Sequence, residues 1–105
     1  MGAFGHIKEQ ITTSILVVDD EIYLATLFRE FLAKAGYNAV VFTNPLLALE
    51  HFKNNPNRYS IIITDLRMPG MSGLELAKKI RELNTPIKIF VVTAFDVSDL
   101  KSKPV

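Results

Sequence analysis

The chain has 105 residues, 49% hydrophobic and 22% charged, a composition typical of one folded domain rather than a disordered segment. The formal net charge of +1 predicts no partner among nucleic acids or charged membranes, and the absence of cysteine excludes disulfides, thiolate nucleophiles and cysteine-based zinc sites. No apolar run approaches the roughly 18 residues of a membrane span, and residues 1–14 lack the apolar segment of a signal peptide. We therefore expect a cytoplasmic protein.

The first predicted elements are a buried strand and an amphipathic helix. Residues 1–14 are aperiodic and are interpreted as a leader or linker. Residues 15–18 form an unbroken apolar run, which is typical of a strand buried on both faces. From Ile22 the apolar period becomes helical, and we expect this helix to end before Gly36. Its expected inward face consists of Leu24, Leu27, Phe28, Phe31, Leu32 and Ala35.

The remaining chain alternates strands and helices with short connections. Further strands are expected at residues 39–42, 61–63 and 87–92, and helices at residues 46–53 and 72 to about 83. Asn44 and Pro45 favour the start of one helix, and Ser72 with Glu75 fits the capping box of the next. This βαβαβαβ order predicts right-handed crossovers, a parallel sheet and helices on both faces.

Acidic residues and one hydroxyl stand at the carboxyl ends of three predicted strands. Asp19 and Asp20 follow the first strand, Asp65 the third, and Thr93 the fourth. In an open α/β sheet, ligands bind at this edge, where the strand order reverses. If the first and third strands are neighbours, three carboxylates converge, and their mutual repulsion favours a divalent cation such as Mg²⁺.

A metal ion beside a carboxylate permits covalent phosphoryl chemistry. Asp65 can attack phosphorus to give an acyl phosphate, while Thr93 donates a hydrogen bond to a phosphoryl oxygen. We interpret the Pro-Gly turn after Asp65 and the glycine at the next helix start as leaving room for that group. Simpler interpretations remain: Asp65 as a turn former, Asp20 as a favourable charge at a helix start, and Thr93 as an ordinary strand residue.

Three blocks of the sequence resemble the receiver domain of two-component response regulators. ILVVDDE at 15–21 resembles the opening strand and acidic pair, and DLRMPGMSGLEL at 65–76 resembles the phosphoacceptor block D-x-x-M-P-x-x-x-G. VVTAF at 91–95 resembles the fourth strand with its hydroxyl–alanine step. The resemblance implies a flavodoxin-like α/β fold, an open parallel sheet of order 2-1-3-4 with helices on both faces. It also implies a phosphoprotein of a signalling phosphorelay.

The resemblance assigns a role to each matching position. Asp65 would be the phosphoacceptor, and Thr93 and Ala94 would bind the phosphoryl group and change position on activation. The implied Mg²⁺ ligands are Asp20, Asp65, Asp19 and the backbone carbonyl of Arg67. The donor would be a histidine kinase or phosphotransfer protein, and the output a changed surface near the fourth strand. No enzyme activity is expected beyond assistance to the chain's own phosphorylation and dephosphorylation.

The C-terminal sequence departs from the family pattern. Receivers carry a lysine followed by proline at the end of a fifth strand, and this chain has Lys103-Pro104. Lys103 comes 10 residues after Thr93, whereas a parallel crossover alone needs about a dozen. We therefore expect residues 15–105 to be a C-terminally incomplete receiver, truncated or internally deleted, in which the fifth strand is missing and Lys103 is a doubtful site residue.

A missing fifth strand has consequences for partners and for function. The fourth strand would become an apolar sheet edge, and one face would lose its covering helix, so we expect a homodimer through that edge. One alternative function is an interaction-only receiver that folds, as a dimer or alone, without holding phosphate. Another is a magnesium phosphatase or phosphotransferase, which is disfavoured because Arg67 stands where such enzymes place a second acid.

Overall fold

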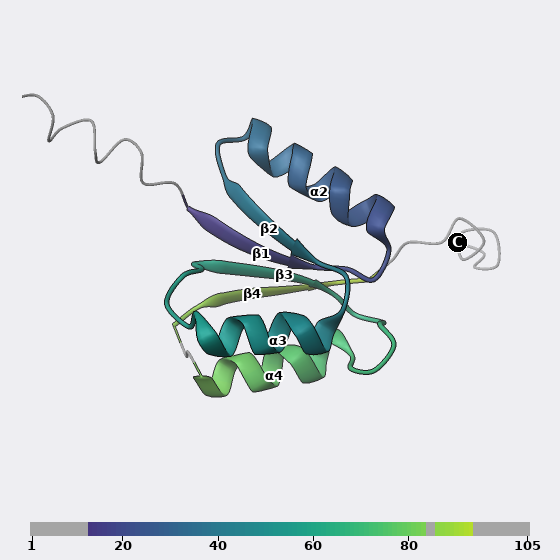
Figure 1. Ribbon diagram of the computed structural model, residues 1–105, viewed down its shortest axis with the longest axis vertical. Coiled ribbons are helices and arrows are strands. Elements are labelled where there is room, and N and C mark those ends of the chain that lie inside the picture. Colours follow the sequence, from purple (N-terminus) through teal and green to yellow (C-terminus); the bar gives the residue numbers. More distant parts are fainter. Residues whose placement is uncertain (1–12, 84–85, 94–105) are drawn as a thin grey trace, which may run out of the picture.

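The computed structural model describes residues 13–83 and 86–93. Strands and helices alternate through this part of the chain (Figure 1). The strands are β1 (Ser14–Val18), β2 (Asn38–Phe42), β3 (Ile61–Asp65) and β4 (Lys88–Val92), and the helices are α2 (Ile22–Lys34), α3 (Pro45–Asn54) and α4 (Gly73–Leu83). Every predicted element is present, and the largest difference in bounds is at β3, which includes Asp65 as its last residue.

The sheet has the predicted topology. Its order is β2-β1-β3-β4 and all neighbouring strands are parallel, which confirms the flavodoxin-like arrangement. Helix α2 covers one face of the sheet, and α3 and α4 lie side by side on the other (Figure 1). Because β1 pairs directly with both β2 and β3, the carboxyl ends of β1 and β3 are neighbours.

Local sequence signals begin the two helices on the α3–α4 face. The Asn44 side-chain oxygen accepts hydrogen bonds from the backbone N–H groups of Leu46 and Leu47, at 2.9 and 3.3 Å. In the capping box before α4, the Ser72 N–H donates to Glu75 Oε1 at 3.0 Å, and the Glu75 N–H donates to Ser72 Oγ at 3.1 Å. These bonds satisfy N–H groups that the first helical turn leaves free, so both predicted helix starts are confirmed.

The main hydrophobic core lies between the sheet and helices α3 and α4. Its fully buried members come from β1, β3 and both helices: Leu16, Val18, Ala48, Phe52, Ile62, Leu76 and Ile80. Met68 and Met71, in the loop after β3, are buried in the same cluster, so both methionines pack rather than take part in chemistry. This core holds the loop that follows Asp65 against α3 and α4.

The predicted inward face of α2 is wrong for several residues. Leu24, Leu27 and Phe31 are 42%, 53% and 78% exposed, and Ala25 is the buried residue of the helix. The reason is that α2 packs mainly on β2 and β1, and no second described helix lies beside it on this face (Figure 1). Ala35 follows the helix as its C-cap. The apolar stripe predicted from the sequence is present on α2, but among the described residues much of it is exposed.

Some predictions fall on residues 1–12 and 94–105, outside the described part of the chain. These include most of the leader and the expected loss of a fifth strand, which therefore stay predictions. Strand β4 is an outer strand of the described sheet. Within the two described segments, no helix is both long enough and apolar enough to cross a lipid bilayer.

Candidate functional site

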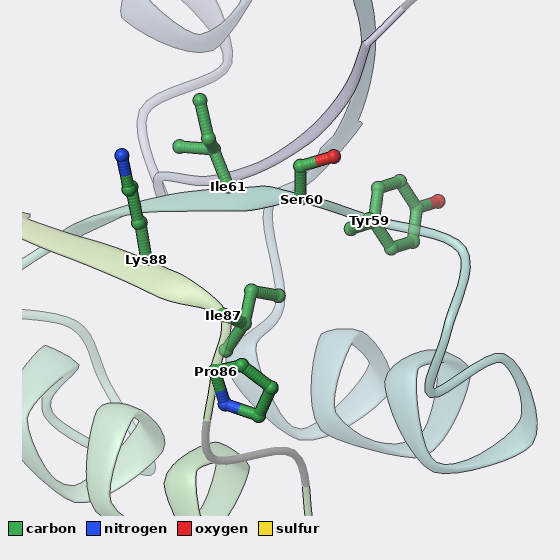
Figure 2. A pocket seen from close by; sticks show the side chains of 6 residues that line it. All are labelled: Tyr59, Ser60, Ile61, Pro86, Ile87 and Lys88. Atoms are coloured by element: carbon green, nitrogen blue, oxygen red, sulfur yellow. The ribbon is translucent and has the colours of Figure 1, made fainter.

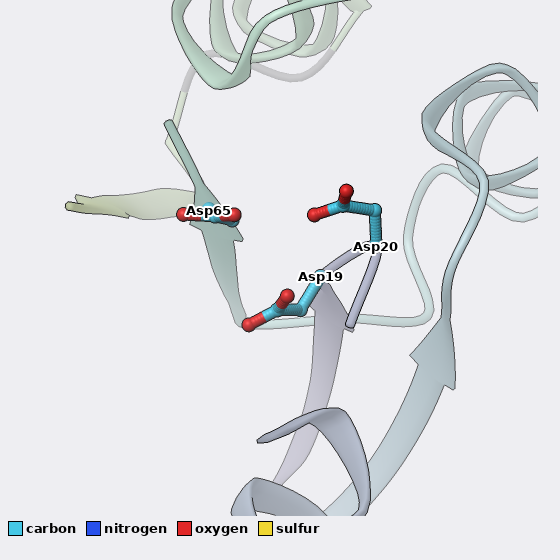
Figure 3. A group of neighbouring side chains, drawn as sticks. All are labelled: Asp19, Asp20 and Asp65. Carbon is cyan, nitrogen blue, oxygen red and sulfur yellow. The ribbon is translucent and has the colours of Figure 1, made fainter. Parts of the chain in front are cut away.

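Three aspartates from two neighbouring strands meet at the carboxyl edge of the sheet. Asp19 and Asp20 directly follow β1, and Asp65 ends β3. Their side chains point into a common space, and one carboxylate oxygen of each lies within 4.8 Å of the others (Figure 3). The parallel pairing of β1 with β3 produces this convergence, because it brings the two strand ends to the same level.

Backbone hydrogen bonds fix two of the three carboxylates. Asp19 Oδ1 accepts from the Glu21 N–H, and Asp65 Oδ1 accepts from the Leu66 N–H, both at 2.9 Å. Asp19 and Asp65 are buried, at 6% and 9% exposed, whereas Asp20 is exposed. The site therefore combines two oriented, partly desolvated acids with one that remains open to solvent.

Burial raises the pKa of both Asp19 and Asp65 above the ordinary value of 3.8. For Asp65 the negative charges of Asp19 and Asp20 raise the pKa further, and for Asp19 those of Asp20 and Glu21 do so. The backbone N–H donors act in the opposite direction without cancelling the rise. A cation placed among these oxygens would relieve the repulsion, so the electrostatics suit a metal ion.

The loop after Asp65 is tied to both neighbouring elements. The Leu66 N–H donates to the Val92 carbonyl, and the Gly73 N–H donates to the Leu66 carbonyl, both at 2.8 Å. A Cβ atom on Gly73 would overlap the backbone carbonyl of Asp65. The glycine at the start of α4 is thus required for close backbone packing, whereas the sequence had suggested that it makes room for a phosphoryl group.

A pocket of ≈ 400 Å³ opens beside the three aspartates. Its lining residues are Asp19, Asp20, Glu21, Leu24, Phe28, Asp65, Arg67, Val92 and Thr93. All predicted site residues in the described part of the chain therefore line one pocket, while Ala94 and Lys103 lie outside that part. The sequence analysis did not predict four of the lining residues, Glu21, Leu24, Phe28 and Val92. The available signal was their position in the chain, since the first three closely follow Asp20 and Val92 directly precedes Thr93.

A second pocket, at the opposite edge of the sheet, has no acidic residue in its lining. It has ≈ 410 Å³ and is lined by Tyr59, Ser60, Ile61, Pro86, Ile87 and Lys88 (Figure 2). Lys88 is the one charged residue of this lining. The chemistry of the described chain is therefore concentrated at the carboxyl edge.

The family of the chain follows from comparison with known proteins. The model described as the response regulator receiver domain matches residues 15–104. This chain belongs to that family. The receiver is 35% identical over 81 residues to the response regulator receiver protein CpdR of Brucella abortus, which covers 77% of this chain and 66% of CpdR. It is 30% identical over 86 residues to sporulation initiation phosphotransferase F of Bacillus subtilis, covering 82% and 68% of the two chains.

Solved receiver structures share the fold. The response regulator TrrA of Thermotoga maritima, in complex with Mg²⁺ and BeF, is 40% identical, with a TM-score of 0.74 and coverage of 87% of this chain and 79% of TrrA. A receiver from Clostridium thermocellum is 26% identical, with a TM-score of 0.76 and coverage of 86% and 70%. The chain spans about two thirds of the length of CpdR and 19% of the regulator ZraR of Klebsiella oxytoca.

Membership fixes the general class of activity. Receiver domains are signalling modules of two-component systems rather than classical enzymes, and they interact with histidine kinases and phosphotransfer proteins. They bind Mg²⁺ at an acidic pocket, and the described chain has an acidic cluster of Asp19, Asp20 and Asp65.

Proposed function

We propose that this receiver accepts a phosphoryl group on Asp65 with the help of Mg²⁺ and signals through a change of its surface. The observation that carries the proposal is the convergence of the three carboxylates within 4.8 Å at the end of β1 and β3. Asp65 is the best nucleophile of the three, because the end of a paired strand and a backbone hydrogen bond fix its position.

The proposed transfer is a displacement at phosphorus. The Leu66 N–H holds Oδ1 of Asp65, so Oδ2 is the oxygen that attacks. A new O–P bond forms on Asp65, and the P–N bond of a phosphohistidine donor breaks. The electron pair of that bond returns to the imidazole nitrogen, which leaves an acyl phosphate on the receiver. The donor is a histidine kinase or a phosphotransfer protein.

Asp20, Asp19, Asp65 and the Arg67 backbone carbonyl are the groups that would hold Mg²⁺. When bound, Mg²⁺ would offset negative charge on the transferring oxygens. Asp20 is exposed beside the other two and suits direct contact with the ion. Asp19 already accepts the Glu21 N–H through Oδ1, so a contact through water suits it better.

Thr93 and Ala94 form the proposed switch. Thr93 follows β4, is exposed and lines the acidic pocket, so its hydroxyl can donate a hydrogen bond to a phosphoryl oxygen. Movement of Thr93 toward that oxygen would alter the surface beside β4. Surface change near β4 is the proposed output.

The alternative is an interaction-only receiver that folds but does not hold phosphate. One observation favours it: Arg67 is the single basic residue lining the acidic pocket in the described chain, and it is exposed. Few positive charges would then stabilise the phosphoryl group. Lys103, the doubtful site residue, lies outside the described part of the chain.

The deciding experiment is intact mass spectrometry after incubation with a small phosphodonor, with and without Mg²⁺. We expect one phosphoryl adduct that requires Mg²⁺ and is absent from Asp65→Asn. Glu82→Gln, which removes an exposed acid on α4 away from the pocket, is the matched control and should be phosphorylated like the unmodified chain. No adduct on a chain that circular dichroism shows to be folded would favour the interaction-only receiver.

A further inference from the structure

Strand β3 buries one hydroxyl among apolar side chains. Thr64 stands directly before Asp65 and is fully buried, and its register partner in β1 is Val18, a member of the main hydrophobic core. Valine has the same branched shape as threonine without the hydroxyl, and burial of a hydroxyl is unfavourable unless it is hydrogen-bonded. A threonine at this position therefore needs a hydrogen-bond partner that a valine would not.

That partner is the main chain of the candidate phosphoacceptor. Thr64 Oγ1 donates to the Asp65 carbonyl at 3.0 Å, and no buried side-chain oxygen or nitrogen in the described part of the chain lacks a partner. The same carbonyl is the group that a Cβ atom on Gly73 would overlap. The carbonyl end of the peptide between Asp65 and Leu66 is thus held by a hydroxyl of β3 and by close packing against the start of α4.

The N–H end of the same peptide has two acceptors. The Leu66 N–H donates to Asp65 Oδ1 at 2.9 Å and to the Val92 carbonyl at 2.8 Å, which is a three-centre hydrogen bond. One acceptor belongs to the side chain that attacks phosphorus in the proposed transfer, and the other directly precedes Thr93. This single N–H therefore links the carboxylate of Asp65 (Figure 3) to the end of β4.

The planarity of the peptide bond couples its two ends. The atoms of one peptide unit lie close to a plane, so a rotation of the Asp65 carbonyl also turns the Leu66 N–H. A hydroxyl that fixes the direction of the carbonyl consequently fixes the direction of the N–H. Through the N–H it also fixes the orientation of the Asp65 carboxylate.

We propose that Thr64 is a positioning residue for the phosphoacceptor. Its hydroxyl holds the plane of the Asp65–Leu66 peptide, and the Leu66 N–H in turn holds Asp65 Oδ1 and leaves Oδ2 free to attack. Thr64 contacts neither the phosphoryl group nor the metal ion and acts only through the main chain. The proposal rests on the proposed phosphorylation of Asp65 and adds the residue that orients this side chain.

Two substitutions at position 64 separate the hydroxyl from the shape of the side chain. Thr64→Val keeps the branched shape and removes the donor, whereas Thr64→Ser keeps the donor and removes a buried methyl group. We expect Thr64→Val to slow Mg²⁺-dependent formation of the phosphoryl adduct by about threefold to tenfold, the factor that one intramolecular hydrogen bond typically contributes. Thr64→Ser should react at nearly the unmodified rate, although loss of the methyl group lowers its free energy of unfolding.

Thr26→Val is the matched control. Thr26 also donates its hydroxyl to a main-chain carbonyl, that of Ile22 at 2.8 Å, but it lies on α2 and does not line the acidic pocket. The same substitution there should leave the rate of adduct formation unchanged. Urea unfolding of all three variants separates effects on the rate from effects on stability. A Thr64→Val chain that reacts at the unmodified rate would overturn the proposal, and so would a Thr64→Ser chain that is slowed as much as Thr64→Val.

A second measurement, by NMR on the metal-free chain, does not require phosphorylation. The Leu66 amide proton should move upfield in Thr64→Val, because a weaker hydrogen bond shields the proton, and should move little in Thr64→Ser or Thr26→Val. If the unmodified chain accepts no phosphoryl group, the proposed function fails, and this measurement still decides whether Thr64 holds the peptide. An unchanged Leu66 amide in Thr64→Val would overturn the proposal. So would side-chain couplings in the unmodified chain that show the Thr64 hydroxyl turned away from the Asp65 carbonyl.

Discussion

Gly73 is packed directly against the backbone carbonyl of Asp65, and a Cβ atom at position 73 would overlap that carbonyl. The start of α4 and the end of β3 therefore touch through their main chains. The Gly73 N–H also donates to the carbonyl of Leu66 at 2.8 Å. The position of the candidate phosphoacceptor consequently depends on a residue eight positions later in the sequence, through backbone contact rather than through a side chain.

We expect Gly73→Ala to destabilise the fold and to disturb Asp65. The added methyl group must push α4 away from β3, and overpacking of this kind costs about 1–3 kcal/mol. Urea unfolding should show a lower free energy of unfolding, and the Mg²⁺-dependent phosphoryl adduct should form less completely. The reason for the second effect is that the Asp65 main chain has to shift.

Gly36→Ala is the control for this substitution. Gly36 has φ +95°, so alanine is strained there, but no atom lies within 4 Å of the added Cβ. It should reduce stability through backbone strain, by about 1–2 kcal/mol, and leave phosphorylation of the folded fraction unchanged. Equal effects of the two variants on phosphorylation would show that Gly73 does not position Asp65.

The raised pKa values of Asp65 and Asp19 predict an unusual pH dependence in the absence of metal. Above the ordinary carboxyl pKa of 3.8 and up to the raised native pKa values, the folded state binds more protons than the unfolded state. The contribution of these groups to the free energy of unfolding therefore falls as pH rises through this window and stays low above it. Excess chelator keeps the measurement free of metal.

Asp65→Asn tests this sign. The amide oxygen can still accept the Leu66 N–H, while the buried charge is removed. In chelator at neutral pH the variant should be more stable in urea than the unmodified chain, and the difference should shrink as pH falls below the window. A variant that is less stable at neutral pH would contradict the repulsion inferred from the burial of this cluster.

Mg²⁺ should reverse that instability in the unmodified chain. A ligand present at about a hundredfold excess over its Kd stabilises the folded state by about 2.7 kcal/mol, so the Tm should rise with added Mg²⁺. Asp20→Asn removes the exposed carboxylate of the cluster and should abolish most of this rise. Glu82→Gln should retain it. An unchanged response of Asp20→Asn would remove Asp20 from the proposed ligand set.

The capping box of α4 should contribute measurably to stability. Ser72→Ala removes the acceptor that holds the Glu75 N–H, and loss of such a cap typically costs about 1 kcal/mol. Glu75→Gln keeps an oxygen that can accept the Ser72 N–H and should cost less. Thermal unfolding of both variants measures the difference in stability. If Ser72→Ala leaves the stability unchanged, tertiary packing alone is enough to start α4.

Much of the fold could be read from local patterns. The unbroken apolar run before Asp19 predicted a strand buried on both faces, and Ile15–Val18 are all buried. Asn44 and Ser72 predicted helix starts because capping depends on groups within three residues of each other. The grouping of Asp19, Asp20 and Asp65 was also predictable, since parallel strands bring their carboxyl ends to one edge.

The sequence by itself determined the order of elements, the helix caps and the edge at which the acids gather, because these depend on neighbours along the chain and on the handedness of parallel connections. Only the tertiary structure decided which side of α2 is buried and why residue 73 is glycine. Helical periodicity marks Leu27 and Phe31 as apolar without showing what covers them, and both are exposed. The contact of Gly73 with Asp65 arises only when α4 is set against the end of β3.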